Sequence, residues 1–195
     1  TAGNVNDYTL TLVDANVAAA STFTVDATAL RSGATTTLGA DGEIGGTGAD
    51  ADVTDDENLS LDASGLTGTR AVSVTGGDGA DTILGGATVD TINGGAGADS
   101  LVGNDGADVI SGGDGADTVT GGAAADNITL GAGADVVIID SVANSTSGSM
   151  DTITDFVSGT DKINITLTTS DSSFDVSGFA VVDNFNDGLV SLSTS

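Results

Sequence analysis

A glycine- and aspartate-rich pattern repeats every nine residues between residues 76 and 138, and it constrains the fold more than any other feature. GGDGADTIL (76–84) is the first of seven uninterrupted copies. The sixth position is always aspartate: Asp81, Asp90, Asp99, Asp108, Asp117, Asp126 and Asp135. The eighth position is always aliphatic: Ile83, Ile92, Leu101, Ile110, Val119, Ile128 and Val137. A short fixed period of this kind is typical of stacked, solenoid-like architectures.

Each repeat predicts one short strand and one turn. The aliphatic residue lies between flanking positions that are mainly polar, which describes the single inward residue of a three-residue strand. The rest of the repeat turns the chain, and its glycines permit positive φ angles. Two consecutive repeats then make one coil, with a strand on each side. Every second aspartate is therefore stacked: 81, 99, 117 and 135 on a first edge, and 90, 108 and 126 on a second.

Stacked carboxylates repel one another unless a cation lies between them. Hard oxygen ligands in a flexible geometry favour Ca²⁺ over Mg²⁺ or Zn²⁺, and turn carbonyls complete the ligand set. We predict that the turn glycines contributing to these sites are Gly76, Gly79, Gly94, Gly97, Gly112 and Gly115. The first edge keeps the glycine at the fourth position, whereas Thr88 and Ala124 replace it on the second edge. We therefore expect up to three well-formed calcium ions on the first edge and at most two weaker ones on the second.

These nonapeptides resemble those of the RTX (haemolysin-type) calcium-binding proteins over about a third of the chain. The resemblance implies an all-β, right-handed parallel β-roll with several Ca²⁺ ions between stacked turns. DTITDFVSGTDKI (151–163) is similar to the segment that follows the last repeat in proteins exported by bacterial type I secretion. That similarity implies that Asp151, Asp155 and Asp161 assist calcium binding or cap the roll. The alternative is a metal-free, glycine-rich solenoid, but such a fold would not require an aspartate at the sixth position of every repeat.

The flanking zones are also β-rich. In residues 1–75, alternating segments such as YTLTLV (8–13) predict short half-buried strands, and FTVDATAL (23–30) matches LSLDASGL (59–66) as a diverged repeat. GGTGAD (45–50) fits one nonapeptide, so Asp50 is a further candidate calcium ligand, with a solvated acidic loop as the alternative. We expect three zones: a β-rich N-terminal segment (1–75), the β-roll (76–138), and a C-terminal cap with a possible secretion region (139–195).

The composition disfavours several classes of partner and of catalytic chemistry. The 195 residues include 29 acidic and three basic residues, a net charge of −26 that disfavours nucleic acid and anionic membranes as partners. No apolar run is long enough to span a membrane. The chain has no histidine and no cysteine, which removes Ser-His-Asp and Cys-His chemistry and thiolate or imidazole metal sites, so we expect no catalytic site. The missing initiator methionine suggests a processed product or part of a longer protein.

Two functions fit this pattern best. The first is a calcium-dependent extracellular structural protein, an S-layer or surface-filament subunit or its assembly region, that self-associates on the bacterial cell surface with polysaccharide as a possible anchor. The second is the calcium-dependent folding and secretion module of an exported enzyme, toxin or adhesin. An ice-binding solenoid fits poorly, because the loop position before the aspartate is alanine in six of the seven repeats and valine in the other.

Overall fold

β-Strands are the only regular secondary structure in the part of the chain that the structure describes. The computed structural model describes residues 8–14, 21–27, 37–38, 44–45, 58–140, 149–165 and 180–181. Within these ranges there is no helix, and so none that could cross a membrane. The strands are β1 (Tyr8–Val13), β2 (Thr22–Asp26), β3 (Thr37–Leu38), β4 (Ile44–Gly45), β5 (Leu59–Gly65), β6 (Ala71–Gly77), β7 (Thr82–Leu84), β8 (Thr91–Ala96), β9 (Ser100–Asp105), β10 (Val109–Asp114), β11 (Thr118–Ala123), β12 (Asn127–Ala132), β13 (Val136–Ile139), β14 (Thr152–Ile153), β15 (Lys162–Ile165) and β16 (Ala180–Val181).

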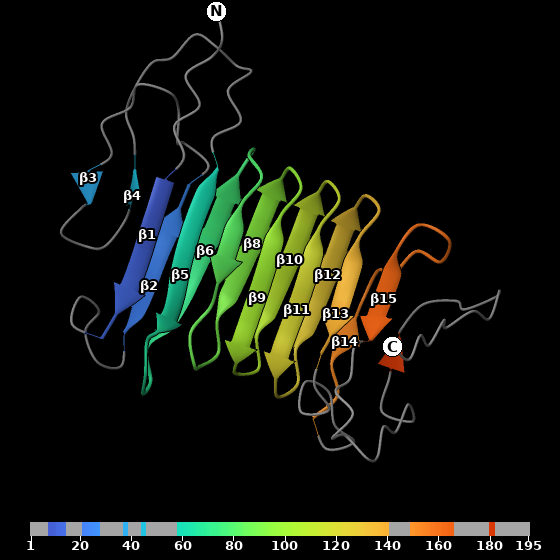
Figure 1. Cartoon of the computed structure of the whole chain (residues 1–195). Helices are drawn as coiled ribbons and strands as arrows, with labels where there is room; N and C mark the ends of the chain where they lie inside the picture. Colours follow the sequence, from blue (N-terminus) through green and yellow to red (C-terminus); the bar gives the residue numbers. More distant parts are fainter. Residues whose placement is uncertain are drawn as a thin grey trace, which may run out of the picture.

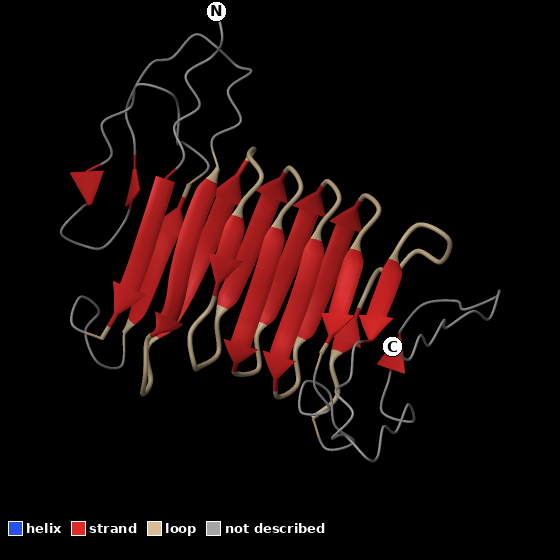
Figure 2. Cartoon of the chain, viewed as in Figure 1, coloured by secondary structure: helices blue, strands red, loops and turns tan. Residues whose placement is uncertain are grey.

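Two parallel sheets form the body of the molecule (Figure 1). Sheet A has the order β1-β5-β7-β9-β11-β13-β15, and sheet B has the order β16-β14-β12-β10-β8-β6-β2. From β5 to β15 successive strands alternate between the two sheets, so each pair of strands is one turn of a coil. Figure 2 shows the resulting stack of strands joined by short turns. The predicted all-β parallel roll is confirmed. The short antiparallel pair β3–β4 is separate from both sheets.

Register within the roll follows the predicted coil of two repeats. In sheet B, Ile92 pairs with Ile110, and Ile110 pairs with Ile128. The strands are longer than the predicted three residues, however. β8 to β12 have six residues each, because the ladder continues through the glycines, with Gly95 opposite Gly113 and Gly113 opposite Gly131. Only β7 among the array strands keeps three residues.

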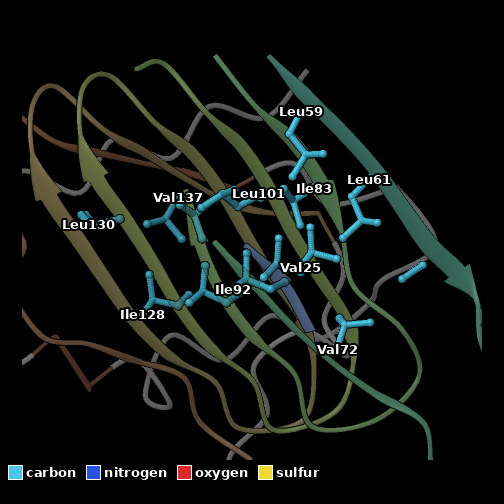
Figure 3. Packing of buried hydrophobic residues seen from close by; sticks show 14 of the residues in the cluster. Val25, Leu59, Leu61, Val72, Ile83, Ile92, Leu101, Ile128, Leu130 and Val137 are labelled. Carbon is cyan, nitrogen blue, oxygen red and sulfur yellow. The ribbon is translucent and has the colours of Figure 1, made fainter. Parts of the chain in front are cut away.

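The core lies between the two sheets. The eighth-position aliphatic residues are all buried, with 0–1% of their surface exposed. Figure 3 shows five of these side chains pointing into the shared interior from both sheets: Ile83, Ile92, Leu101, Ile128 and Val137. The same cluster continues into the N-terminal strands through Leu12, Val25, Leu59, Leu61, Val72 and Val74. The alternating segments of the N-terminal zone therefore extend the roll, as their period-two pattern predicts.

The diverged repeat of the N-terminal zone predicts two strands, but it does not predict which sheet each strand joins. Val25 of one copy and Leu61 of the other both point inward. The copies nevertheless lie in different sheets, since β2 pairs with β6 and β5 pairs with β1 and β7. A matching inward–outward alternation gives two strands the same local shape, while the connections decide which sheet each one joins.

The segment 151–163 adds one more coil to the end of the roll. β14 pairs with β12 and β15 pairs with β13, which places Ile153 beside Ile128 and Ile163 beside Val137. Phe156, between the two strands, is buried in the same core. This segment therefore adds a coil of its own after the array, in addition to any capping role, and β16 pairs with β14 beyond it.

Candidate calcium site

The seven repeat aspartates form two buried columns along the edges of the roll. In each column, the Oδ1 atom of one aspartate accepts a hydrogen bond from the backbone N–H of the aspartate 18 residues earlier. The N–H of Asp81 donates to Asp99 at 2.7 Å, and the N–H of Asp90 donates to Asp108 at 2.7 Å. The predicted stacking of every second aspartate is thus observed directly. The remaining links are Asp99 to Asp117, Asp117 to Asp135, and Asp108 to Asp126.

The second carboxylate oxygen of most column members has no hydrogen-bond partner. Six aspartates, each with 1–2% of its surface exposed, present a buried Oδ2 atom that accepts no hydrogen bond from the described residues: Asp81, Asp99, Asp108, Asp117, Asp126 and Asp135. Leaving a buried carboxylate oxygen unpaired is costly, because nothing replaces the water that it loses. A cation held against these oxygens removes that cost.

The first glycine of each repeat makes room for such an ion. A methyl group on Gly94 would lie 2.7 Å from the carbonyl oxygen of Gly112 and closer still to Oδ2 of Asp99. A carboxylate oxygen and a turn carbonyl therefore converge on the same small space. The same arrangement recurs at the predicted residues Gly76 and Gly112. It also recurs at Gly85 and Gly103 on the second edge, which were not predicted although they occupy the same column of the repeat.

The fourth-position glycines shape the turns. Gly97 and Gly115 have positive φ angles of 115° and 138°. A side chain on either would collide with the carbonyl oxygen of the glycine one coil earlier, Gly79 for Gly97 and Gly97 for Gly115. Glycine is therefore required twice at these positions, by conformation and by the close approach of the next turn. The prediction that these residues belong to the calcium-binding turns agrees with this geometry.

Comparison with known protein families agrees with the geometry. The family model of the RTX calcium-binding nonapeptide repeat, which describes four copies, matches residues 73–101 and 102–137. The protein carries RTX calcium-binding repeats. No curated protein matches the chain significantly. RTX repeats bind calcium, and the buried aspartate columns fit that ion, since carboxylate and carbonyl oxygens are its preferred ligands.

The electrostatics of the RTX region also favour a cation. In the absence of an ion, burial raises the pKa of Asp81 to about 7, and the charge of Asp99 adds to the increase. Burial likewise raises the pKa of Asp108 to about 7 and that of Asp99 to about 6, in both cases against a backbone hydrogen bond that lowers it. The pKa values of Asp117 and Asp135 are raised for the same reason. These carboxylates resist ionisation unless a positive charge is near.

The second edge of the RTX region is closed by hydrogen bonds at its first member. Oδ2 of Asp90 accepts the N–H of Gly86 at 2.6 Å, in contrast to the unpaired Oδ2 atoms of the other six repeat aspartates. The side-chain amide of Asn104 donates to the carbonyl oxygen of Gly85 at 2.7 Å. Gly85 is the first residue of its repeat, so this hydrogen bond occupies a turn carbonyl on the second edge. Ala124, which replaces the fourth-position glycine, has a positive φ of 96°. These features agree with the prediction that the second edge holds calcium less well.

The coil after the RTX region continues both columns. Oδ1 of Asp151 accepts the N–H of Asp126, and Oδ1 of Asp161 accepts the N–H of Asp135. The carboxyl groups of Asp126 and Asp151 interact directly, and burial raises the pKa of Asp151 to about 7. Both residues thus extend the candidate sites by one coil. Asp161 differs because its Oδ2 also accepts the N–H of Val157 at 2.7 Å.

The remaining predicted ligands lie elsewhere. Asp155 stands outside the columns, and its two oxygens accept the N–H groups of Leu130 and Gly131 at 2.7 and 2.8 Å. It therefore caps the last turn of the first edge, and its role as a calcium ligand stays a prediction. Asp50 lies outside the described residues. Nowhere in the described ranges do three carboxylates converge on one point, so each ion needs backbone carbonyls in addition to one or two aspartates.

Proposed function

We propose that this chain is a calcium-dependent structural protein of the bacterial cell surface, an S-layer or surface-filament subunit or its assembly region. It folds and assembles when it binds calcium after export. The observation that carries the proposal is the pair of buried carboxylate columns in a chain of net charge −26. Extracellular calcium modules bind with dissociation constants of about 10⁻⁴ to 10⁻³ M, so a roll of this kind folds outside the cell and stays unfolded inside it.

The sheet faces support self-association. An outward row of sheet B is uncharged along six strands: Thr24, Ser73, Thr91, Val109, Asn127 and Thr152. On sheet A, Thr82, Ser100, Thr118 and Val136 form a similar uncharged row. Two copies can therefore meet along these rows without bringing carboxylates of the rows together, whatever the total charge. The same hydroxyl-rich rows suit hydrogen bonding to a cell-surface polysaccharide, which we propose as the anchor.

We assign no catalytic role to the chain. The absence of histidine and cysteine limits acid–base and nucleophilic chemistry to carboxylates and hydroxyls. The repeat aspartates are committed to the columns, where backbone N–H groups fix their orientation. A structural role makes use of every one of these features, whereas a hydrolytic role uses none of them.

Electron microscopy of the purified chain tests the proposal. In 10 mM CaCl₂ we expect ordered sheets or filaments, which disperse when EGTA is added in excess and do not form when MgCl₂ replaces calcium. A chain that folds with calcium yet stays monomeric under all conditions would overturn the structural role and favour the folding module of a longer exported protein. Circular dichroism of the same samples separates folding from assembly.

A further inference from the structure

The coils before the RTX region contain no carboxylate that needs an ion, among the residues that the structure describes. Their described aspartates are surface residues with partners in the protein. Asp14 accepts hydrogen bonds from the N–H and hydroxyl of Thr67 and forms an ion pair with Arg70 at 3.2 Å. Asp62 accepts the N–H and hydroxyl of Ser64 at 3.0 and 2.6 Å. The unpaired buried carboxylates begin only at Asp81.

The interior of these first coils is also of a different kind. Along β5, three successive inward positions are apolar and buried: Leu59, Leu61 and Ala63. In β8 and β10 a single isoleucine is followed by a buried glycine, so each of these two strands contributes one apolar side chain. Apolar burial is independent of calcium, and the middle strands of the array have less of it than β5 has. The first coils therefore depend less on ions for their stability than the middle of the array does.

Contacts within the first coils join chain segments that lie far apart in the sequence. The ion pair of Asp14 with Arg70 connects the end of β1 to the turn between β5 and β6. Arg70 also donates to the carbonyl oxygen of Thr67, which fixes that turn. β2 pairs with β6 from Thr22 to Asp26, and β1 pairs with β5 with one register shift between Thr11 and Val13. Together these strands make two complete coils with a continuous core.

The junction with the array is made by hydrogen bonds from backbone N–H groups and a hydroxyl. The N–H groups of Leu59 and Val72 donate to Oδ1 of Asp81 and Asp90 at 2.7 and 2.8 Å. On the other side of the junction, the hydroxyl of Thr88 donates to the carbonyl oxygen of Arg70 at 2.6 Å. Thr88 is the residue that breaks the glycine pattern of the second edge, and this contact gives it a function. The first half-coils of the array thus dock onto the preceding coils through hydrogen bonds that need no ion.

We propose that β1, β2, β5 and β6 fold without calcium and form a template on which the calcium-dependent coils are added in order from β7 onward. The closed hydrogen bonding of Asp90 with Gly86 lies in the first coil of the array, next to the template. Asp135, one coil before the far end of the described roll, still carries an unpaired buried oxygen, so the calcium-dependent part extends nearly to that end. The proposal rests on the calcium-dependent folding included in the proposed function and adds its direction and starting point.

Hydrogen exchange of the full chain, followed by mass spectrometry, tests the template. In EGTA we expect slow exchange in peptides that cover residues 59–75, and exchange at least a hundredfold faster in peptides that cover 91–132. With 10 mM CaCl₂ both regions become protected. If residues 59–75 exchange in EGTA as fast as residues 91–132, the template does not exist. Slow exchange of residues 91–132 in EGTA would instead overturn the calcium dependence on which the proposed function rests.

A pair of matched core variants tests whether the template directs folding. Leu61→Ala shortens a side chain that is 1% exposed in the template, and Ile110→Ala shortens one that is 1% exposed in the array. After a jump from EGTA to saturating calcium, we expect Leu61→Ala to fold at least tenfold more slowly than the wild type. Ile110→Ala should raise the calcium midpoint and leave the protection of residues 59–75 in EGTA unchanged. Loss of template protection in Leu61→Ala with an unchanged folding rate would overturn the directed order.

Discussion

Substituting Gly94 with alanine should fill a calcium site and leave the backbone conformation acceptable. Gly94 does not have a positive φ, so alanine introduces no conformational strain of its own there. Its methyl group would lie 2.7 Å from the carbonyl oxygen of Gly112, and closer still to Oδ2 of Asp99. Both oxygens are candidate ligands of the same ion. The substitution therefore tests whether the space above the first glycine of a repeat is used to hold calcium.

The expected loss has two parts. Displacing the two oxygens costs about 1–3 kcal/mol, as overpacking does in other buried sites. A site with a dissociation constant of about 10⁻⁴ M contributes about 2.7 kcal/mol in 10 mM calcium, and the variant loses this as well. Alanine returns about 0.4–1 kcal/mol because it restricts the unfolded chain. We therefore expect Gly94→Ala to lower the free energy of unfolding by about 3–5 kcal/mol in 10 mM calcium.

Gly86→Ala is the matched control. Its methyl group would lie 3.6 Å from Oδ2 of Asp90 and 3.7 Å from the carbonyl oxygen of Ala63, which are ordinary contacts, and Gly86 also lacks a positive φ. We expect this variant to be as stable as the wild type or more stable. Urea unfolding in 10 mM CaCl₂ measures the free energies, and isothermal titration calorimetry counts the ions. If the two variants bind equal numbers of ions and differ by less than about 0.5 kcal/mol, the usual range of substitutions that disturb nothing, the reasoning about the ion cradle is refuted.

Three further predictions concern the second edge and pH. Ala124→Gly should stabilise the calcium-loaded roll by about 1 kcal/mol, because it relieves the backbone strain of a residue with a φ of 96°. Ala123→Gly should destabilise the roll by about the same amount. Thermal unfolding of the two variants distinguishes these outcomes. Asp108→Asn should raise the calcium midpoint more than Asp90→Asn does. The reason is that Oδ2 of Asp108 has no hydrogen-bond partner among the described residues, whereas Oδ2 of Asp90 accepts the N–H of Gly86. Equal midpoints in calcium titrations would contradict the closure of the Asp90 site. In calcium-free solution the folded pKa of Asp81 and Asp108 is about 7, above the ordinary value of 3.8. The stability that these groups contribute is therefore fully present below pH 4. It is lost as the pH rises to 7, by about 1.4 kcal/mol per group and pH unit. Circular dichroism of resin-decalcified protein should therefore show more β-structure at pH 4 than at pH 7.5, and an unchanged signal would count against the buried carboxylates.

The array could be predicted closely because one sequence column corresponds to one physical environment. A position that is aspartate in every repeat became a buried column, and a position that is aliphatic in every repeat became the core. Strand length was predicted less well. The glycines were assigned to turns because glycine permits turning, yet the ladder continues through them, as Gly95, Gly113 and Gly131 show. Composition alone does not distinguish a glycine that turns from one that keeps its side of a strand clear.

Residues outside the repeat could be predicted only in part. Asp151 and Asp161 continue the columns because each begins an Asp-x-Ile triplet of the same form as in the repeats, a signal present in the sequence. The capping contacts of Asp155 with Leu130 and Gly131 have no such signal, because they join residues 25 and 24 positions apart through a longer coil. The docking of Thr88 against Arg70 is also invisible to the repeat alignment, in which Thr88 is only a departure from glycine.

The two columns make the stability of the roll a function of the calcium concentration. A site with a dissociation constant of about 10⁻⁴ M contributes about 1.4 kcal/mol in 1 mM calcium and almost nothing at 10⁻⁷ M. Five such contributions, the largest number of ions expected on the two edges together, sum to about 7 kcal/mol, which is comparable to the whole stability of a typical domain. Apolar side chains in place of the aspartates would stabilise the fold equally on both sides of a membrane. Because the aspartates are buried and most have an oxygen without a hydrogen-bond partner, we expect the array to fold near neutral pH only where calcium is abundant, and the proposed calcium-independent template would set the end at which folding begins.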